Sequence, residues 1–349
     1  MRPLDAILED WDTIKKRYTH WWANELYDRA LVQVTQPKEG VQRGEWPGGA
    51  VTPESRWLNI EYMIWRMEET IRTTYYGGET LPNFFHAWAV GHALLMGCEP
   101  RIGDGTGTVW VDPLPAAADG YPPIRFLREG HWWQWMRDST LRAAQASRGR
   151  YWVMPMWGNN AGDTLAMVRG NNELMMDIAE DPTWVRQAAR QVSDILIEVY
   201  ATLWPLVGER VTGIEGSINY CNTWSPGRTM GFDCDLSCMI SPRQFEDLFL
   251  PPLIETMRTV DHRFYHLDGA VALHHLGLLL SVPEIQAIQW VPGTGREEIL
   301  QWVPVIRRIQ QAGKSVYVYA EAKEIPALLG EVSARGLCIA TRCASEQEA

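Results

Sequence analysis

The sequence predicts an α/β protein whose strands close into a (β/α)₈ TIM barrel with an N-terminal helical extension. From Tyr151 onward, strand-like runs alternate with helical segments, and this alternation is typical of a parallel sheet. Six such runs, with one or two more strands before residue 100, favour a closed barrel over an open sheet. The runs cover residues 151–156, 211–217, 263–267, 285–290, 315–320 and 337–341.

The first part of the chain contains two helical segments with a strand between them. Residues 4–27 place apolar side chains three and four positions apart, and Asp5 is the expected N-cap. Residues 31–36 alternate as a strand does. Residues 54–76 again have amphipathic helical spacing and precede two glycines that end the helix.

Residues 103–123 are rich in Gly, Asp and Pro and predict an irregular or β-hairpin insertion. Their glycines lack the Lys-Ser/Thr ending of a phosphate-binding loop and precede a strand-like run, which disfavours a nucleotide site. Further along, Ser241-Pro242 marks a helix start as N-cap and first helical residue. We expect one domain over residues 1–349, with residues 1–30 as the helical extension.

The composition is that of a folded protein with a large core. The 349 residues are 46% hydrophobic and 21% charged, and the formal net charge is -11. Nucleic acids and anionic membrane surfaces attract basic patches, so we expect this acidic chain to bind neither. The six cysteines form no CxxC pair and the first residues contain no apolar signal region, so we expect a cytoplasmic protein with reduced thiols.

The strongest functional indication is the run from Phe264 to Gly269. Residues i and i+2 of an extended strand point to the same side, so His266 and Asp268 would face one cavity. Gly269 lets the backbone turn where the strand ends. Barrel enzymes collect catalytic groups at this end of their strands. A buried histidine satisfied by a nearby aspartate has the same pattern and stays open as an alternative.

Polar and aromatic residues follow the other strand-like runs as well. Tyr220 is a candidate catalytic residue that would orient a substrate or donate a proton. Asp235 in apolar surroundings would have a raised pKa and act as a general acid or base, although a helix-capping role near Ser237 explains it equally well. The candidate substrate-binding residues are Trp157, Asn159, Asn222, Trp224, Gln289 and Trp290, and for each tryptophan alone core packing is an alternative.

Several segments of the second half occur in an order that is known from one superfamily. They are Asp235-Leu236-Ser237, residues 240–246, Pro251, the turn His266-Leu267-Asp268-Gly269 and the pair Gln289-Trp290. Through them, roughly residues 30–349 resemble the uroporphyrinogen decarboxylase superfamily, whose TIM barrels include tetrapyrrole decarboxylases and cobalamin-linked methyltransferases. The Arg-Gln-Ala-Gly-Arg motif of the decarboxylases is absent, because residues 28–32 read Asp-Arg-Ala-Leu-Val. The resemblance therefore favours the methyltransferase branch.

The resemblance to the methyltransferase branch implies a metal site. That branch holds zinc with a His-x-Cys pair and a distant cysteine, and the zinc activates a thiol as methyl acceptor. Here His266 matches the histidine, Asp268 stands in the place of the cysteine, and Cys343 lies near the place of the distant cysteine. A carboxylate makes the site harder, so Zn²⁺ or another divalent metal is implied. Glu321 or Glu324 is a candidate further ligand, with a surface salt bridge as the alternative; for Cys343 the alternative is a reduced bystander.

The residues and the resemblance leave three functions open. The first is a methyltransferase that acts on a small methylated substrate, assisted by a metal and linked to a corrinoid supplied by a partner protein; a homodimer is one assembly we consider. The second is a metal-free decarboxylase or lyase for a small carboxylated or cyclic substrate, in which Asp235, His266 and Asp268 do acid–base work. The third is a sugar-binding or glycoside-processing barrel with tryptophans as stacking platforms.

Overall fold

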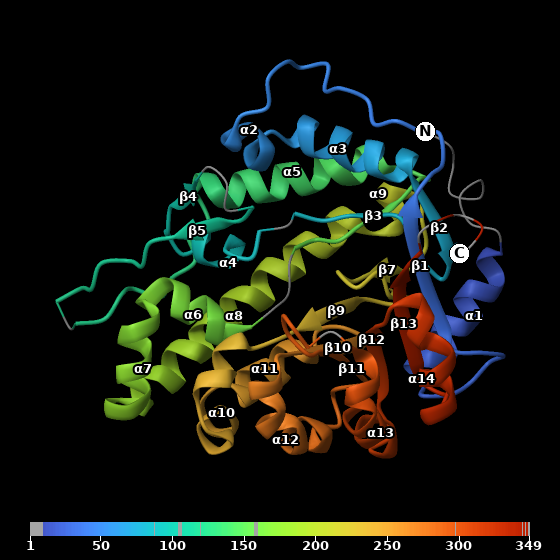
Figure 1. Cartoon of the computed structure of the whole chain (residues 1–349). Helices are drawn as coiled ribbons and strands as arrows, with labels where there is room; N and C mark the ends of the chain where they lie inside the picture. Colours follow the sequence, from blue (N-terminus) through green and yellow to red (C-terminus); the bar gives the residue numbers. More distant parts are fainter. Residues whose placement is uncertain are drawn as a thin grey trace.

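A mostly parallel sheet lies at the centre of the molecule, with helices around it (Figure 1). The computed structural model describes residues 10–86, 88–103, 107–118, 120–156, 160–296, 298–343, 345 and 347. The sheet has seven strands in the order β2-β1-β13-β12-β11-β10-β9. These strands are β1 (Leu31–Pro37), β2 (Thr74–Gly78), β9 (Thr229–Phe232), β10 (His262–Asp268), β11 (Ala287–Val291), β12 (Ser315–Tyr319) and β13 (Leu337–Arg342).

Every neighbouring pair in this sheet is parallel except β1 and β2, which are antiparallel. The strand runs that the sequence predicts at residues 31–36, 263–267, 285–290, 315–320 and 337–341 are confirmed as β1 and β10 to β13. Parallel strands require crossover connections, and the helices between these strands supply them. The expectation of an α/β fold is therefore confirmed.

The backbone hydrogen bonds between the described strands do not close the sheet into a barrel. Strands β3 (Asn83–Phe84) and β6 (Trp152–Val153) pair in parallel with each other as a separate sheet. Among the described residues, no ladder joins this pair to β9 or β2 at the edges of the seven-stranded sheet. Strands of two residues offer few backbone groups to a ladder, which accounts for the interruption. The central sheet of the described chain is thus open in its hydrogen bonding, where the sequence led us to expect a (β/α)₈ closure.

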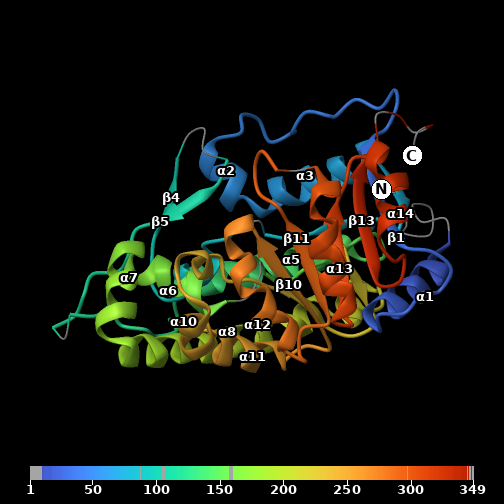
Figure 2. The same ribbon diagram turned by 60° about the horizontal axis from the view of Figure 1, so that its bottom comes forward.

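Helices cover the outside of the sheet and one flank of the molecule (Figure 2). The longest, α8, packs against α5, α6 and α11. The α-helices are α1 (Trp11–Trp22), α2 (Pro53–Leu58), α3 (Ile60–Thr73), α4 (Gly91–Leu94), α5 (His131–Ser147), α6 (Ala161–Arg169), α7 (Asn171–Glu180), α8 (Pro182–Val207), α9 (Glu209–Thr212), α10 (Pro242–Leu248), α11 (Leu250–Met257), α12 (Leu276–Ser281), α13 (Val303–Gln311) and α14 (Ile325–Glu331). Among the described residues, no helix is both apolar enough and long enough to cross a membrane.

The single helix expected over residues 54–76 is broken into α2, α3 and the strand β2. Asn59 leaves the helical conformation at φ -85° and ψ 101°, and its side chain accepts hydrogen bonds from the backbone N–H groups of Glu61 and Tyr62. Such a cap starts a new helix at Ile60. Beyond Thr73 the chain becomes β2, because pairing with the edge of β1 satisfies its backbone.

The prediction of a strand over residues 211–217 is wrong. Glu209–Thr212 forms α9, which ends at Gly213 with φ 68°, a left-handed conformation that suits glycine. The β-structure in this region is a short hairpin of β7 (Ser217–Ile218) and β8 (Trp224–Ser225). Another hairpin, β4 (Pro100–Ile102) with β5 (Val109–Val111), overlaps the insertion that we expected over residues 103–123.

The N-terminal helix α1 is shorter than the predicted segment 4–27 and is capped by Asp10, whose side chain accepts from the Thr13 N–H. The expected cap, Asp5, lies outside the described residues. A buried carboxylate anchors α1 to the sheet: Glu79 accepts hydrogen bonds from Arg17 at 2.8 Å, from Arg29 at 2.8 and 2.9 Å, and from the Val32 N–H at 2.8 Å. Glu79 thereby joins α1, β1 and the end of β2.

We predict that Glu79→Ala lowers the free energy of unfolding by about 3 kcal/mol, because Arg17, Arg29 and the partly buried N–H of Val32 all lose the buried carboxylate that accepts their hydrogen bonds. Urea denaturation followed by tryptophan fluorescence measures this loss. Asp12→Ala is the matched control, since Asp12 forms an exposed ion pair with Lys15 and should change stability by less than about 0.5 kcal/mol. Equal losses in the two variants would contradict the anchoring role of Glu79.

Candidate functional site

His266 and Asp268 lie near the end of β10, and their side chains point to the same side of the sheet. The register pairs His266 with Gln289, Gln289 with Tyr317, and Tyr317 with Cys338, so these four residues form one level across β10 to β13. Two positions beyond His266, Asp268 has the same orientation by the pleat of the strand. Gly269 follows with φ +77°, a conformation that any other residue would adopt only with strain, and it turns the chain away.

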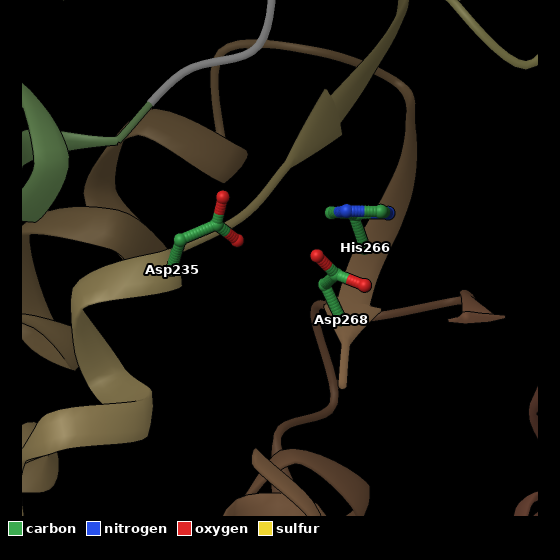
Figure 3. Close-up of side chains that lie close together, drawn as sticks. All are labelled: Asp235, His266 and Asp268. Atoms are coloured by element: carbon green, nitrogen blue, oxygen red, sulfur yellow. The ribbon is translucent and has the colours of Figure 1, made fainter. Parts of the chain in front are cut away.

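Asp235 completes a cluster with these two residues. It lies at the start of a 3₁₀ helix, Asp235–Met239, that follows β9. One ligand atom from each of Asp235, His266 and Asp268 lies within 4.8 Å of the others. Figure 3 shows the Asp235 carboxylate pointing toward His266 and Asp268 from the opposite side of the site. We call these three residues the Asp-His-Asp cluster.

The imidazole of His266 is oriented by its neighbour on β11. Its Nδ1 lies 2.6 Å from Oε1 of Gln289, and Nε2 of Gln289 donates to the Tyr319 hydroxyl at 3.4 Å. An amide oxygen only accepts, so in this network Nδ1 carries the proton and Nε2 keeps its lone pair. A histidine prepared in this way can bind a metal or accept a proton through Nε2.

Two further carboxylates, the buried Asp233 and the partly buried Asp163, line the same cavity as Asp235. The side-chain amide of Asn160 donates to Asp163 at 2.8 Å and to Asp233 at 2.6 Å. Asp163 also accepts the backbone N–H groups of Asp235 at 2.9 Å and Leu236 at 2.7 Å. Asp163 therefore fixes the start of the 3₁₀ helix and with it the direction of Asp235.

Burial and mutual repulsion shift the proton affinity of these carboxyls. Burial raises the pKa of Asp163 and raises that of Asp233 to about 7, with the charges of Asp163 and Asp235 adding to the second shift. Burial and the Asp163 charge raise the pKa of Asp235 to about 6, while His266 opposes this rise. Carboxyls poised near neutrality are suited to exchange protons with a substrate.

Sequence reasoning missed Asp233 as a site residue, although a signal was present. Asp233 and Asp235 are two positions apart, as His266 and Asp268 are, and they directly follow the strand β9. Two polar residues at this spacing after a strand share one side, so the same argument applies to both pairs. The four residues of β9 are all buried and do not alternate with polar residues, so the period of two that marks a strand is absent there.

One cavity is lined by Asp235 of the cluster, and a second is lined by Tyr220 and Tyr319 near His266. The first has a volume of about 620 Å³ and is lined by Asn160, Asp163, Asp233 and Asp235 together with Trp110 of the β4–β5 hairpin. The second, of about 520 Å³, is lined by residues that include Tyr220, Asn222, Tyr319 and Arg342. Volumes of this size suit small molecules.

Tyr220 and Asn222, two of the sequence candidates, line the second cavity. The Tyr220 side chain is partly buried, and its ring centroid lies 6.2 Å from that of His266 at an interplanar angle of 83°. Gly231 makes room for this ring, because a Cβ there would collide with it. Burial raises the pKa of Tyr220, so the phenol stays protonated. Gln289 acts on His266 and does not line this cavity.

Two candidate tryptophans are packed in the core. Trp224 is 2% exposed, donates to the Glu215 carbonyl and packs against Trp11. Trp290 is fully buried on the opposite side of β11 from Gln289 and packs edge-on against Trp302. The expectation that these two indoles line a binding mouth is corrected to the core-packing alternative. Trp157 and Asn159 lie outside the described residues.

The structure also corrects the expected ligand set beyond His266 and Asp268. Asp235 is grouped with that pair, whereas Cys343 lines a third cavity of about 690 Å³ beside Arg342. Glu321 forms an ion pair with Lys323 at 2.5 Å. Glu324 accepts the N–H groups of Ile299 and Glu321 and is used as a cap. The reason is geometric: these groups follow strands β12 and β13, far around the sheet from β9.

The donor atoms of the cluster are one nitrogen and carboxylate oxygens. Such a set suits a divalent cation of intermediate or hard character, such as Zn²⁺ or Mn²⁺, and lacks the thiolates that select softer ions. The acidic residues behind the cluster add negative charge that attracts a cation. The residues present therefore fit a divalent metal.

Fold and cluster together define an α/β protein that gathers polar groups at the carboxyl ends of parallel strands, where barrel enzymes work. No family model matches the chain, and no curated protein matches it. Among solved structures, it is similar to a methyltransferase from Methanosarcina mazei, with a TM-score of 0.62 and 13% sequence identity over 95% of this chain and 93% of that chain. This likeness establishes a shared fold; membership of the uroporphyrinogen decarboxylase superfamily stays a prediction from sequence.

We predict that Asn160→Ala destabilises the metal-free protein by about 2–3 kcal/mol at pH 8, because the buried carboxylate of Asp233 and the partly buried one of Asp163 lose their shared donor. The same loss raises the pKa of Asp233 further. A carboxyl whose folded-state pKa exceeds the unfolded value stabilises the fold at low pH, and this contribution is lost as the pH rises. The destabilisation should therefore be smaller at pH 5 than at pH 8.

Urea denaturation at both pH values, in buffer with a chelator, measures this difference. Asn171→Ala is the control, because Asn171 is exposed on the same cavity and should have little effect at either pH. A loss that is the same at both pH values would contradict the proposed role of Asn160 between two charges.

Proposed function

We propose that this protein is an enzyme, a methyltransferase that acts on a small methylated substrate with the help of a divalent metal and transfers the methyl group to a corrinoid carried by a partner protein. The observation that carries the proposal is the Asp-His-Asp cluster, whose ligand atoms lie within 4.8 Å of one another at the ends of adjacent strands. The shared fold with a methyltransferase supports it.

Asp235, His266 and Asp268 would hold the metal, and Gln289 would keep the Nε2 of His266 free for it. A divalent cation there would act as a Lewis acid on the heteroatom that carries the methyl group. The buried phenol of Tyr220, whose ring lies 6.2 Å from that of His266, would help to exclude water and orient the substrate. Asp163 would keep Asp235 in position through the backbone of the 3₁₀ helix.

A second candidate function is a metal-free decarboxylase or lyase for a small carboxylated or cyclic substrate. The observation that favours it is the raised pKa of Asp235, about 6, beside an imidazole with an available lone pair. An acid and a base of this kind would exchange protons with a substrate between them. The sugar-binding alternative loses its support, because Trp224 and Trp290 are packed in the core.

We predict that the purified protein binds about one divalent metal ion per chain and that His266→Ala abolishes this binding. Gln289→Leu should weaken the affinity by roughly 10- to 100-fold, because it removes the partner that orients the imidazole. Elemental analysis and competition with a chelator measure both effects. His131→Ala, at an exposed site on α5, should bind as the wild type does. Wild-type protein without metal, or an unaffected His266→Ala, would favour the lyase.

For methyl transfer, we predict that the enzyme converts cob(I)alamin to methylcob(III)alamin when supplied with one member of a panel of O-, N- and S-methylated small molecules. The absorbance of cobalamin reports the reaction. His266→Ala should reduce the rate to the uncatalysed background, since the substrate heteroatom is no longer polarised. Metal binding without turnover of any panel member would retain the site but contradict the methyltransferase proposal.

A further inference from the structure

The three cavities described above differ in the charge of their linings. The 620 Å³ cavity is lined by Asp112, Asp163, Asp233 and Asp235, with Arg101 as its one arginine. The 520 Å³ and 690 Å³ cavities share Arg342 in their linings, and Arg43 lines the larger one. In a chain with a net charge of -11, an opening with this cationic lining favours anions.

Arg342 lines both of these cavities. It ends β13, opposite Thr35 of β1, and its side chain is exposed. Among the described residues, the one acidic residue that lines either cavity is Glu321, and its carboxylate forms an ion pair with Lys323 at 2.5 Å. Within the described part of the chain, Arg342 forms no ion pair. A guanidinium that faces a cavity without a carboxylate partner can bind one from a ligand, because its planar donors match both oxygens.

Neutral hydroxyl groups line the same cavity beside Arg342. Burial raises the pKa values of Tyr220 and Tyr319, so both phenols stay uncharged near neutral pH and do not repel an anion. Thr35 and Asn222 add further polar side chains to the lining. A charged donor surrounded by neutral polar groups is a typical arrangement for binding a small carboxylate.

The cavity is connected to the Asp-His-Asp cluster by hydrogen bonds. The Tyr319 hydroxyl accepts from Gln289, and Gln289 accepts from Nδ1 of His266. Strands β10 and β13 are three positions apart in the sheet, about 14 Å along it at the usual strand spacing. A molecule whose carboxylate is held at Arg342 would therefore extend its other end toward His266.

We propose that Arg342 binds the carboxylate of the substrate in the 520 Å³ cavity, so that the substrate is a small carboxylic acid with its reacting group at the opposite end. The identity of the reacting group, a methyl on a heteroatom, rests on the proposed function above. The carboxylate site itself rests on the cavity, the arginine and the lining hydroxyls.

Isothermal titration with three probes of increasing length tests the proposal: methoxyacetate, 4-methoxybutanoate and 4-methoxybenzoate. At least one should bind the wild type, and Arg342→Met should weaken this binding by roughly tenfold or more, as expected when a charged hydrogen-bond partner is lost. Arg342→Lys should retain part of the affinity. The neutral analogue 4-methoxybenzamide should bind the wild type and Arg342→Met equally weakly.

Arg101→Met is the matched control, because it removes the same charge from the acidic cavity and should leave probe affinity unchanged. Thermal unfolding of each variant establishes that it is folded, and Arg342→Lys provides a second reading if Arg342→Met is not. The proposal is overturned if none of the three acids binds, if acid and amide bind alike, or if Arg101→Met weakens binding as much. Tighter binding of inorganic phosphate than of every acid would also overturn it.

The titrations contain no corrinoid, so their result is independent of methyl transfer. Carboxylate binding that depends on Arg342, without any methyl transfer, would sustain this inference and contradict the proposed methyltransferase. Turnover of neutral methylated compounds at a rate unaffected by Arg342→Met would sustain the proposed methyltransferase and contradict the carboxylate site at Arg342.

Discussion

The amide of Asn160 donates to the buried carboxylate of Asp233 and to the partly buried carboxylate of Asp163, and the geometry of the site depends on this contact. Carboxylates are costly to bury unless hydrogen-bond donors surround them. Asn160 supplies one N–H to each, and the backbone of Asp235 and Leu236 supplies the rest for Asp163. Hydrogen bonds to the Asp163 carboxylate thus hold the start of the 3₁₀ helix that follows β9. The direction of Asp235 follows from this.

The carboxylates of the site also repel one another. Asp163, Asp233 and Asp268 repel Asp235, while His266 offsets part of this repulsion. A bound divalent cation would offset more and would stabilise the folded state by the free energy of its binding. In this view the cluster is more favourable when a cation occupies it, because the surrounding protein supplies excess negative charge.

Sequence patterns predicted β10, which carries His266 and Asp268, and the three strands that follow it. All four strands are apolar runs bounded by clear turn residues. The i, i+2 rule then correctly placed both side chains on one side. It was less useful for the tryptophans, since an indole at a strand end serves the core or a pocket equally well and only tertiary packing decides. The third residue of the cluster could not be predicted either. Whether Asp235 or Cys343 lies near His266 depends on distances between strands, which only the tertiary structure fixes. Open hydrogen bonding at β3 and β6 reflects strand lengths that periodicity does not reveal.

The common level of His266, Gln289, Tyr317 and Cys338 restricts how chain length can vary in relatives of this protein. Side chains alternate along a strand, so one residue inserted within β10 before His266 would turn the imidazole toward the helices and bring an apolar neighbour inward. The same insertion in the loop after Gly269 would leave the level intact. Insertions and deletions should therefore accumulate in the loops and be excluded from the strand segments that precede the site.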